Sequence, residues 1–431
     1  MKIGFYFDSR HLGKWTWSEF LAGELALSGT DSQILLMMSQ LSKNGYDVNF
    51  FSTASDDHLR WLSQIVVDSL ENAADLSKGM GADVLILTNR ANQDTITGLR
   101  RCEQVDQPCI VWDQNGPDPE MADLLFALTC VRRVICVSAI QADDHRDNPV
   151  FEKIEVIHNA IINNFSSIDE SVTRNPLGVC YLGALVPAKG FHRLARVWPE
   201  VRKKFPEANL TVIGSAHLYN RYEPLGPLGV SYPEYEYSEI IPYLGSSREE
   251  AERNGVTFVG LMPPNTIKKI LLSKSIGVMN PMCSSETFGI SGLEIQRCGA
   301  ALIGGDGGGT REASQDGNTG ILVKSDGELY EALTGLLASP ETARKMGKNG
   351  SKWVKNNFSP DLIMKKWCLL LNAVQNHEKP HNPPFSWKRA TPRVVLRECI
   401  RQARKIPFLR GRLPTLYNLN CMIKKYGIFS K

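Results

Sequence analysis

The sequence predicts an α/β protein made of two domains, each a doubly wound parallel sheet covered by helices, followed by a basic tail. Length is the first observation behind this prediction, because 431 residues are too many for one compact core. The second is the alternation of short apolar runs with helical stretches, which is typical of βα units with right-handed crossovers. The third is a polar interruption of that alternation at residues 160–176, which we interpret as a linker between the domains.

The first domain is expected over residues 1–165, where helical stretches such as 31–43 separate apolar runs. The predicted strands are 2–7, 48–52, 84–88, 109–112, 134–137 and 154–157. Ligands of parallel sheets bind at the carboxyl ends of the strands, so the loops after these strands are candidate site loops.

The second domain is expected over residues 176–357 and repeats the rhythm. Its predicted strands are 177–185, 210–213, 256–259, 276–280 and 301–303. Its predicted helices are 189–205, 264–273, 288–298, 326–338 and 340–357. The insertion 215–254, rich in Tyr and Pro, is too long for an ordinary connection and is predicted to be a lid or an acceptor platform. A half-apolar helix is expected within residues 358–378.

Two glutamates, Glu286 and Glu294, lie close to the predicted start of the helix 288–298. On one helix, eight positions would separate them by about 12 Å and roughly 80° of rotation, so they flank a common ligand only if Glu286 lies in the preceding loop. The first helical N–H groups then lie unpaired between the two carboxylates, at the positive end of the helix dipole. These are the amides of Phe288, Gly289, Ile290 and Ser291. The pattern indicates a phosphate site, with ordinary loop and surface carboxylates as the alternative interpretation.

The residues around this pair resemble the donor-binding half of family 4 retaining glycosyltransferases of the GT-B fold. The matching positions are Glu286, Phe288, Gly289, Glu294, Gly299, Gly307, Gly308, Gly309, Glu312, Gly317, Thr319 and Gly320. The resemblance implies two Rossmann-like domains whose parallel sheets face each other across a cleft, with the helix in residues 358–378 crossing back to the N-terminal domain. It also implies that Glu286 contacts the transferred sugar, that the Phe288 and Gly289 amides hold the diphosphate, and that Glu294 binds the ribose. A carboxylate suits a vicinal diol, because two acceptor oxygens meet two O–H donors.

The segment 181–191 resembles the family segment in which an arginine and a lysine grip the diphosphate. Lys189 is retained, and the resemblance places it with Glu286 as a catalytic residue. Ala184 stands where the arginine is usual, which removes one bidentate donor. Arg193 and Arg311 are candidate replacements, and without one the donor would bind weakly. A solvent-facing lysine at a helix start is the alternative interpretation of Lys189.

Four further donor-side candidates lie at or near the ends of predicted strands. They are Gly183, Gly214, Gly260 and Leu261. The resemblance places the nucleobase near such strand ends, although core strands with turn glycines explain these residues equally well.

On the acceptor side, Gly29 and Thr30 lie where relatives have a Gly-Gly loop, and helix capping by Thr30 is an equally good account. Relatives often carry a histidine after a middle strand. The stretch 110–116 has none, so Asp113 or Asn115 is the candidate there, while His158 is interpreted as a turn residue.

The chemistry implied by the resemblance is retaining transfer from a nucleotide-sugar, a co-substrate rather than a bound cofactor. No second carboxylate is evident that could lie about 5 Å from Glu286 as a covalent nucleophile, so we expect same-face attack. No Asp-x-Asp motif lies on a predicted strand-end loop, so we expect no metal requirement. The ten cysteines form no CxxC pair, and we expect neither disulfides nor zinc.

The tail, expected over residues 379–431, carries 13 Lys and Arg against the single acid Glu398, so its charge is +12 and residues 1–378 carry −9. Basic residues at helical spacing, on a segment with a separate apolar face, are typical of a helix that lies on anionic lipid. They are Arg393, Arg397, Arg401 and Arg404. A self-packed tail is the main alternative. We expect no nucleic-acid partner, because no aromatic-basic platform accompanies the charge.

A hydrophobic content of 42% and a charged content of 22% indicate a globular protein, and neither a signal peptide nor an 18-residue apolar run is evident. We therefore expect a cytoplasmic protein, peripheral on the inner face of the membrane. The expected activity is glycosyl transfer to a lipid-linked or cell-surface glycan acceptor. The alternatives are a GT-B nucleotide-sugar epimerase and, because of Ala184, a non-catalytic sugar-nucleotide-binding or assembly protein.

Overall fold

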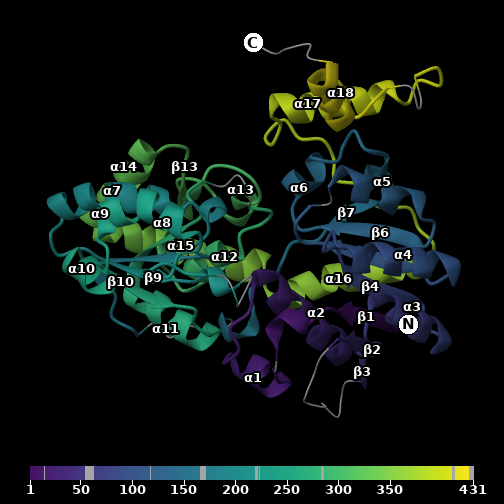
Figure 1. The fold of residues 1–431 in the computed structure, drawn as a ribbon, viewed down its shortest axis with the longest axis horizontal. Helices are drawn as coiled ribbons and strands as arrows, with labels where there is room; N and C mark the ends of the chain where they lie inside the picture. Colours follow the sequence, from purple (N-terminus) through teal and green to yellow (C-terminus); the bar gives the residue numbers. More distant parts are fainter. Residues whose placement is uncertain are drawn as a thin grey trace.

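The computed structural model describes residues 1–13, 15–53, 63–116, 118–165, 171–218, 222, 224–282, 286–409 and 413–426. Two parallel sheets with helices on both faces form two domains that lie side by side (Figure 1). The first sheet has the order β3-β2-β1-β4-β5-β6-β7 and the second the order β10-β9-β8-β11-β12-β13. The predicted fold class, two doubly wound parallel α/β domains, is confirmed.

In the N-terminal domain the order of the parallel strands reverses between β1 and β4. Ligands of such sheets bind at the carboxyl ends of the strands beside this point. The strands are β1 (Lys2–Phe7), β2 (Asp47–Ser52), β3 (Ser63–Val66), β4 (Val84–Thr88), β5 (Cys109–Asp113), β6 (Val131–Cys136) and β7 (Ile154–Val156). The helices are η1 (Arg10–Leu12), α1 (Trp17–Ala22), α2 (Gly29–Lys43), α3 (Leu70–Gly79), α4 (Gln93–Gln104), α5 (Pro119–Ala127), α6 (Ala139–Asp143), η2 (Pro149–Lys153) and η3 (Asn163–Phe165). The edge strand β3 was not predicted, because its sequence Ser-Gln-Ile-Val lacks a sustained apolar run.

The C-terminal domain repeats this arrangement. Its strands are β8 (Asn175–Leu182), β9 (Asn209–Ile213), β10 (Val256–Gly260), β11 (Lys274–Met279), β12 (Ala301–Gly305) and β13 (Gly320–Val323). Its helices are η4 (Pro187–Lys189), α7 (Phe191–Lys204), η5 (Ala216–Leu218), α8 (Pro233–Glu239), α9 (Ile241–Leu244), α10 (Arg248–Arg253), α11 (Pro264–Ser273), α12 (Ile290–Arg297), α13 (Thr310–Ala313), α14 (Asp326–Ala338) and α15 (Pro340–Asn357). Strand β13 is an addition to the predicted set.

The insertion 215–254 forms η5, α8, α9 and α10 in its described part. Helices α8 and α9 pack against α7, where the hydroxyl of Tyr235 lies 2.7 Å from Nδ1 of His192. Most of the described part of the insertion is therefore a helical cover of the C-terminal domain, and of its described residues Leu218 alone lines the donor pocket. Residues 219–221 and 223 lie outside the described residues.

After α15 the chain returns to the N-terminal domain. Helix α16 (Pro360–Gln375) packs against α2, and the ring of Trp367 contacts that of Trp112, with 5.1 Å between centroids. The tail continues as α17 (Pro392–Ala403) and α18 (Leu416–Tyr426), which lie over α5 and α6 (Figure 1). Of the alternatives left open for the tail, the packed one therefore holds for its described part. No helix in the described residues has the length and apolar character needed to cross a membrane.

Candidate active site

The loop between β11 and α12 places Glu286 beside the first turn of α12, as the spacing of the two glutamates predicts. The helix begins at Ile290, two residues later than expected, with Gly289 as its N-cap. Gly289 has φ +89°, and an added Cβ would lie 3.0 Å from Met279, so the turn requires glycine. This turn directs the first free amides of α12 into the cleft.

These amides line a cavity of about 150 Å³ between the two domains. It brings together many of the predicted site residues, namely Gly29, Thr30, Asn115, Gly183, Lys189, Glu286, Phe288, Gly289, Ile290 and Ser291. We call this space the donor pocket. An added Cβ on Gly29 would lie 2.9 Å from Cδ1 of Ile290, so the N-termini of α2 and α12 approach each other here. Two helix N-termini at one pocket favour an anionic ligand.

The remaining predicted strand-end residues lie next to the donor pocket rather than in its wall. The N–H of Gly214 donates to the carbonyl of Gly260 at 2.9 Å, and an added Cβ on Gly214 would overlap the carbonyl of Gly183. Leu261 lines a smaller neighbouring cavity with His217 and Leu218. Their proposed contact with a nucleobase stays a prediction.

Glu286 is held by two partners at one carboxylate oxygen. Nζ of Lys189 lies 2.8 Å from Oε2, and Nδ2 of Asn280 donates to the same oxygen at 2.7 Å. Asn280 directly follows β11 and has φ +26°, a conformation in which Asn is better tolerated than most residues. The sequence argument missed Asn280, although its place at a strand end was a usable signal.

Glu294 lies one turn into α12, where no ion pair or hydrogen bond of its carboxyl occurs among the described residues. Burial raises the pKa of this carboxyl to about 8. Glu294 is not part of the wall of the donor pocket. A half-buried carboxyl without a partner among the described residues suits hydroxyl donors of a ligand, but its ribose role stays a prediction.

Lys189 is the one cation that lines the donor pocket within the described part of the chain. The candidate replacements for the missing arginine at Ala184 are engaged elsewhere. Arg193 bonds to Asp326 and the carbonyl of Pro281, and Nε of Arg311 lies 2.6 Å from Asp306. Neither arginine lines the donor pocket, so a role of either as the second cation stays a prediction.

The start of α2 is fixed by a cap and a buried ion pair. Oγ of Ser28, and not Thr30, accepts the N–H of Asp31 at 3.2 Å. Asp31 also pairs with Arg90 and His11, each at 2.9 Å. These neighbours hold the pKa of the Asp31 carboxyl below its usual range.

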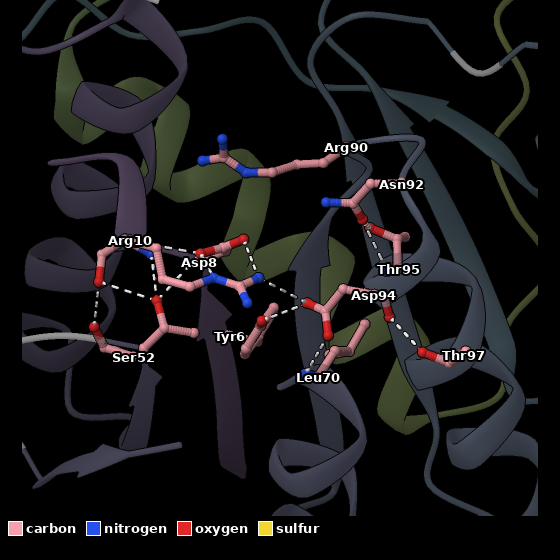
Figure 2. Close-up of polar contacts among 12 residues, drawn as sticks. Tyr6, Asp8, Arg10, Ser52, Leu70, Arg90, Asn92, Asp94, Thr95 and Thr97 are labelled. Atoms are coloured by element: carbon pink, nitrogen blue, oxygen red, sulfur yellow. Dashed lines mark hydrogen bonds and ion pairs between the residues drawn. The ribbon is translucent and has the colours of Figure 1, made fainter. Parts of the chain in front are cut away.

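A polar network at the carboxyl ends of β1, β2 and β4 lies beside this cap (Figure 2). Asp8 pairs with Arg10 at 2.7 Å, and the hydroxyl of Tyr6 donates to Asp94 at 2.7 Å. In Figure 2 Arg90 stands apart from these residues, in keeping with its pairing to Asp31. The network stiffens the strand ends that carry the α2 loop.

Hydrogen bonds connect loops of the two domains at the edge of the donor pocket. Oγ of Ser138 donates to the carbonyl of Thr287 at 2.6 Å, and Oγ1 of Thr287 donates to the carbonyl of Gln114 at 2.7 Å. Glu312 accepts the N–H groups at the start of α6 and lies 2.9 Å from Nε2 of His158. His158, interpreted from the sequence as a turn residue, thus takes part in an interdomain contact.

A second cavity, of about 370 Å³, opens next to the donor pocket. Asn115, Glu286 and Thr287 line both cavities. Asp113 lines neither, because it is fully buried and accepts hydrogen bonds from Asn89 and Gln141. Burial raises the pKa of Asp113 to about 7. Of the two candidates on this loop, Asn115 therefore faces the cleft and Asp113 supports the loop from beneath.

The described residues include no group of three His, Cys, Asp or Glu side chains that could hold a metal ion. The described residues at the junction of the two cavities present one carboxylate, one ammonium group and the free amides of two helix N-termini.

Comparisons with known proteins agree with this geometry. The sequence model of the family described as "Glycosyl transferases group 1" matches residues 167–353. The GDP-mannose-dependent alpha-(1-6)-phosphatidylinositol monomannoside mannosyltransferase of Mycolicibacterium smegmatis is 31% identical over 188 residues. This match covers 42% of the present chain and 44% of that protein, so it spans less than half of the relative.

Solved structures resemble the whole architecture. Sucrose-phosphate synthase from Thermosynechococcus elongatus has a TM-score of 0.65 and 16% identity, over 88% of this chain and 100% of that chain. Anabaena HepE in complex with UDP-glucose has a TM-score of 0.60 and 15% identity, over 86% and 100%. At such low identity the likeness shows a common fold.

Proposed function

Because this chain is a family 4-like protein of the GT-B glycosyltransferases, we propose that it transfers a sugar from a nucleotide-sugar to a hydroxyl group of a glycan or lipid-linked acceptor. One observation carries the proposal. Glu286 lies at the junction of two cavities, one walled by helix N-termini and Lys189, the other open toward the N-terminal domain. A donor and an acceptor bound in these cavities would meet at this carboxylate.

The diphosphate of the donor binds at the amides of residues 288–291, opposite the N-terminus of α2. Lys189 neutralises part of its charge and holds Glu286 toward the sugar through the 2.8 Å ion pair. Helix amides replace the bidentate donor that is lost at Ala184, since they offer N–H groups at the positive end of a dipole. Glu294 accepts the ribose hydroxyls.

Transfer proceeds with retention by same-face attack. The acceptor oxygen forms a bond to the anomeric carbon while the bond from that carbon to the phosphate oxygen breaks. The acceptor proton passes to the leaving phosphate, and Glu286 holds the sugar. Lys189 and the amides stabilise the negative charge that grows on the leaving diphosphate, so the reaction requires no divalent metal.

The acceptor is presented at an anionic membrane surface, which the outer face of the tail contacts. Large apolar side chains are exposed there, among them Ile406 at 53%, Phe408 at 70% and Met422 at 51%. Arg393 and Lys405 are exposed basic residues of the same tail. An apolar face with flanking cations is typical of an interfacial helix, and it suits a cytoplasmic protein that is peripheral on the inner face of the membrane.

This surface carries less charge than the sequence predicted. Arg397 pairs with Asp147, Arg401 with Glu398, and Arg404 with the carbonyl of Asp147, so three of the four predicted lipid-binding arginines have protein partners. The apolar side chains therefore contribute more to the proposed membrane contact than the arginines do.

Incubation with labelled nucleotide-sugars and a lipid-linked acceptor tests the proposal. Product formation by the wild type, lost in Glu286→Gln with nucleotide binding intact, is the expected result. Binding without transfer or hydrolysis would favour the non-catalytic alternative that Ala184 suggests. The epimerase alternative would need acid–base histidines or carboxylates in the cleft; the described lining of the donor pocket holds no histidine and one carboxylate, Glu286, and release of free epimer would favour this alternative.

A further inference from the structure

The second cavity has a wall that belongs to the C-terminal tail. Loop and helix residues of the N-terminal domain form one side, and Arg397, Thr415 and Tyr417 form the outer side. The volume of about 370 Å³ falls within the usual range of about 300–1,000 Å³ for small-molecule sites. Since Glu286 and Asn115 line this cavity and the donor pocket alike, a group bound here lies next to the transferred sugar.

The tail wall is held by buried charges. Nη1 of Arg397 lies 2.6 Å from Oδ1 of Asp147, whose other oxygen accepts the N–H of Leu416. Arg146, fully buried, pairs with Asp143 at 2.6 Å and with Glu398 of the tail at 3.2 Å. Removing the tail would leave the buried Asp147 without its cation and Arg146 without one of its two carboxylates, which is costly. The tail residues are therefore a fixed part of the cavity.

The charges of the cavity disfavour an anionic ligand, because its described lining carries three carboxylates, Asp144, Asp147 and Glu286, and one arginine, Arg397. Asp147 is matched by Arg397, and Glu286 by Lys189. Asp144 is an exposed residue that lines the cavity, and within the described part of the molecule Arg397 and Arg393 interact with its carboxylate electrostatically without a direct ion pair. Burial lowers the pKa of its neighbour His145 to about 4, so that imidazole is neutral near pH 7. An excess of carboxylates accepts hydrogen bonds from hydroxyl groups and repels phosphate or carboxylate.

Apolar and aromatic groups complete the cavity. Pro119, Ala122 and Ile140 lie among its lining residues, and the ring of Tyr417, on α18, is 44% exposed. Carboxylates that accept hydrogen bonds from hydroxyl groups, next to an apolar surface and an aromatic ring, suit a sugar, which has both hydroxyl groups and C–H faces.

We propose that the C-terminal tail forms one wall of the acceptor site, and that a neutral, hydroxyl-rich sugar or polyol unit of the acceptor binds in this cavity between Asp144 and Tyr417. The assignment of this sugar to the acceptor rests on the proposed glycosyl transfer. The binding of a sugar in the cavity can be measured without turnover.

The test uses the full chain and two variants, Tyr417→Ala and Asp144→Asn. Both side chains face the cavity, and both substitutions leave the Arg397–Asp147 pair intact. The substitution Arg397→Ala is avoided because it would leave the buried Asp147 without its cation. Tyr237→Ala is the matched control, because Tyr237 is a 59% exposed tyrosine on α8 of the other domain. The probes are neutral methyl glycosides and the corresponding uronates, and binding is measured by saturation-transfer NMR.

We expect the wild type and the control to bind methyl glycosides. Each cavity variant should bind them about tenfold more weakly, which corresponds to about 1.4 kcal/mol of binding free energy. Nucleoside diphosphate affinity should be equal in all four proteins. Equal glycoside binding in all four, absent binding in the wild type, or uronates bound as well as glycosides would each overturn the inference. Glycoside binding at the cavity without any sugar transfer would support it while refuting the proposed function.

Discussion

Replacing Lys189 with alanine gives the sharpest test of the donor pocket, because no second cation lines that pocket in the described residues. A hydrogen bond to a charged group contributes about 1.5–3 kcal/mol. In the unliganded protein Nζ already lies 2.8 Å from Glu286, so part of the interaction with phosphate replaces an existing ion pair. We therefore expect a loss of about 2 kcal/mol, which is an affinity about 30-fold lower for a nucleoside diphosphate.

Isothermal titration with UDP and GDP measures this loss, and the matching nucleosides are the control. The lysine is predicted to contact phosphate alone, so nucleoside binding should not change in Lys189→Ala. Lys189→Arg should recover part of the affinity, since it keeps the charge at a different geometry. Unchanged diphosphate affinity in Lys189→Ala, or an equal loss for the nucleosides, would refute the assignment of Lys189 to the diphosphate.

Five further predictions concern the two glutamates and the tail. Glu286→Gln should abolish transfer in a labelled-donor assay and leave nucleotide affinity within about twofold, because the amide keeps its shape but not its charge. Glu294→Ala should weaken nucleotide binding by about 1.5–3 kcal/mol in the same titration, and an unchanged affinity would count against the ribose role. The pKa of Glu294 is raised to about 8, so the folded state keeps a proton that the unfolded state releases above about pH 4.5. The free energy of unfolding measured in urea should therefore fall as the pH rises from about 4.5 to about 8. This fall should be smaller in Glu294→Gln, which has no carboxyl to titrate at this position. Asp147→Asn should lower the free energy of unfolding by about 3 kcal/mol and make the tail sensitive to limited proteolysis, whereas an intact tail would argue against the buried pair as its anchor. Phe408→Ser should reduce sedimentation with anionic liposomes at low salt, and wild-type protein that ignores such liposomes would refute the membrane contact.

Local patterns in the sequence were sufficient for the fold class and for the outline of the donor pocket. Apolar runs, glycines and helix starts are local signals, and the loop from Glu286 to Ser291 is one short segment whose helix N-terminus follows from its own sequence. The edge strand β3 gave no comparable signal, because its four residues are polar or half-exposed.

Contacts between distant segments were decided by the tertiary structure alone. Lys189 and Glu286 are 97 positions apart, and Arg397 and Asp147 are 250 apart, so no periodicity links them. The sequence identified the arginines of the tail by their charge, but charge and spacing are the same for a helix on lipid and for a helix paired with buried carboxylates. Packing against α6 turned Arg397 toward Asp147 and brought Tyr417 to the second cavity, because a buried carboxylate is stable only with a cation or N–H donors beside it.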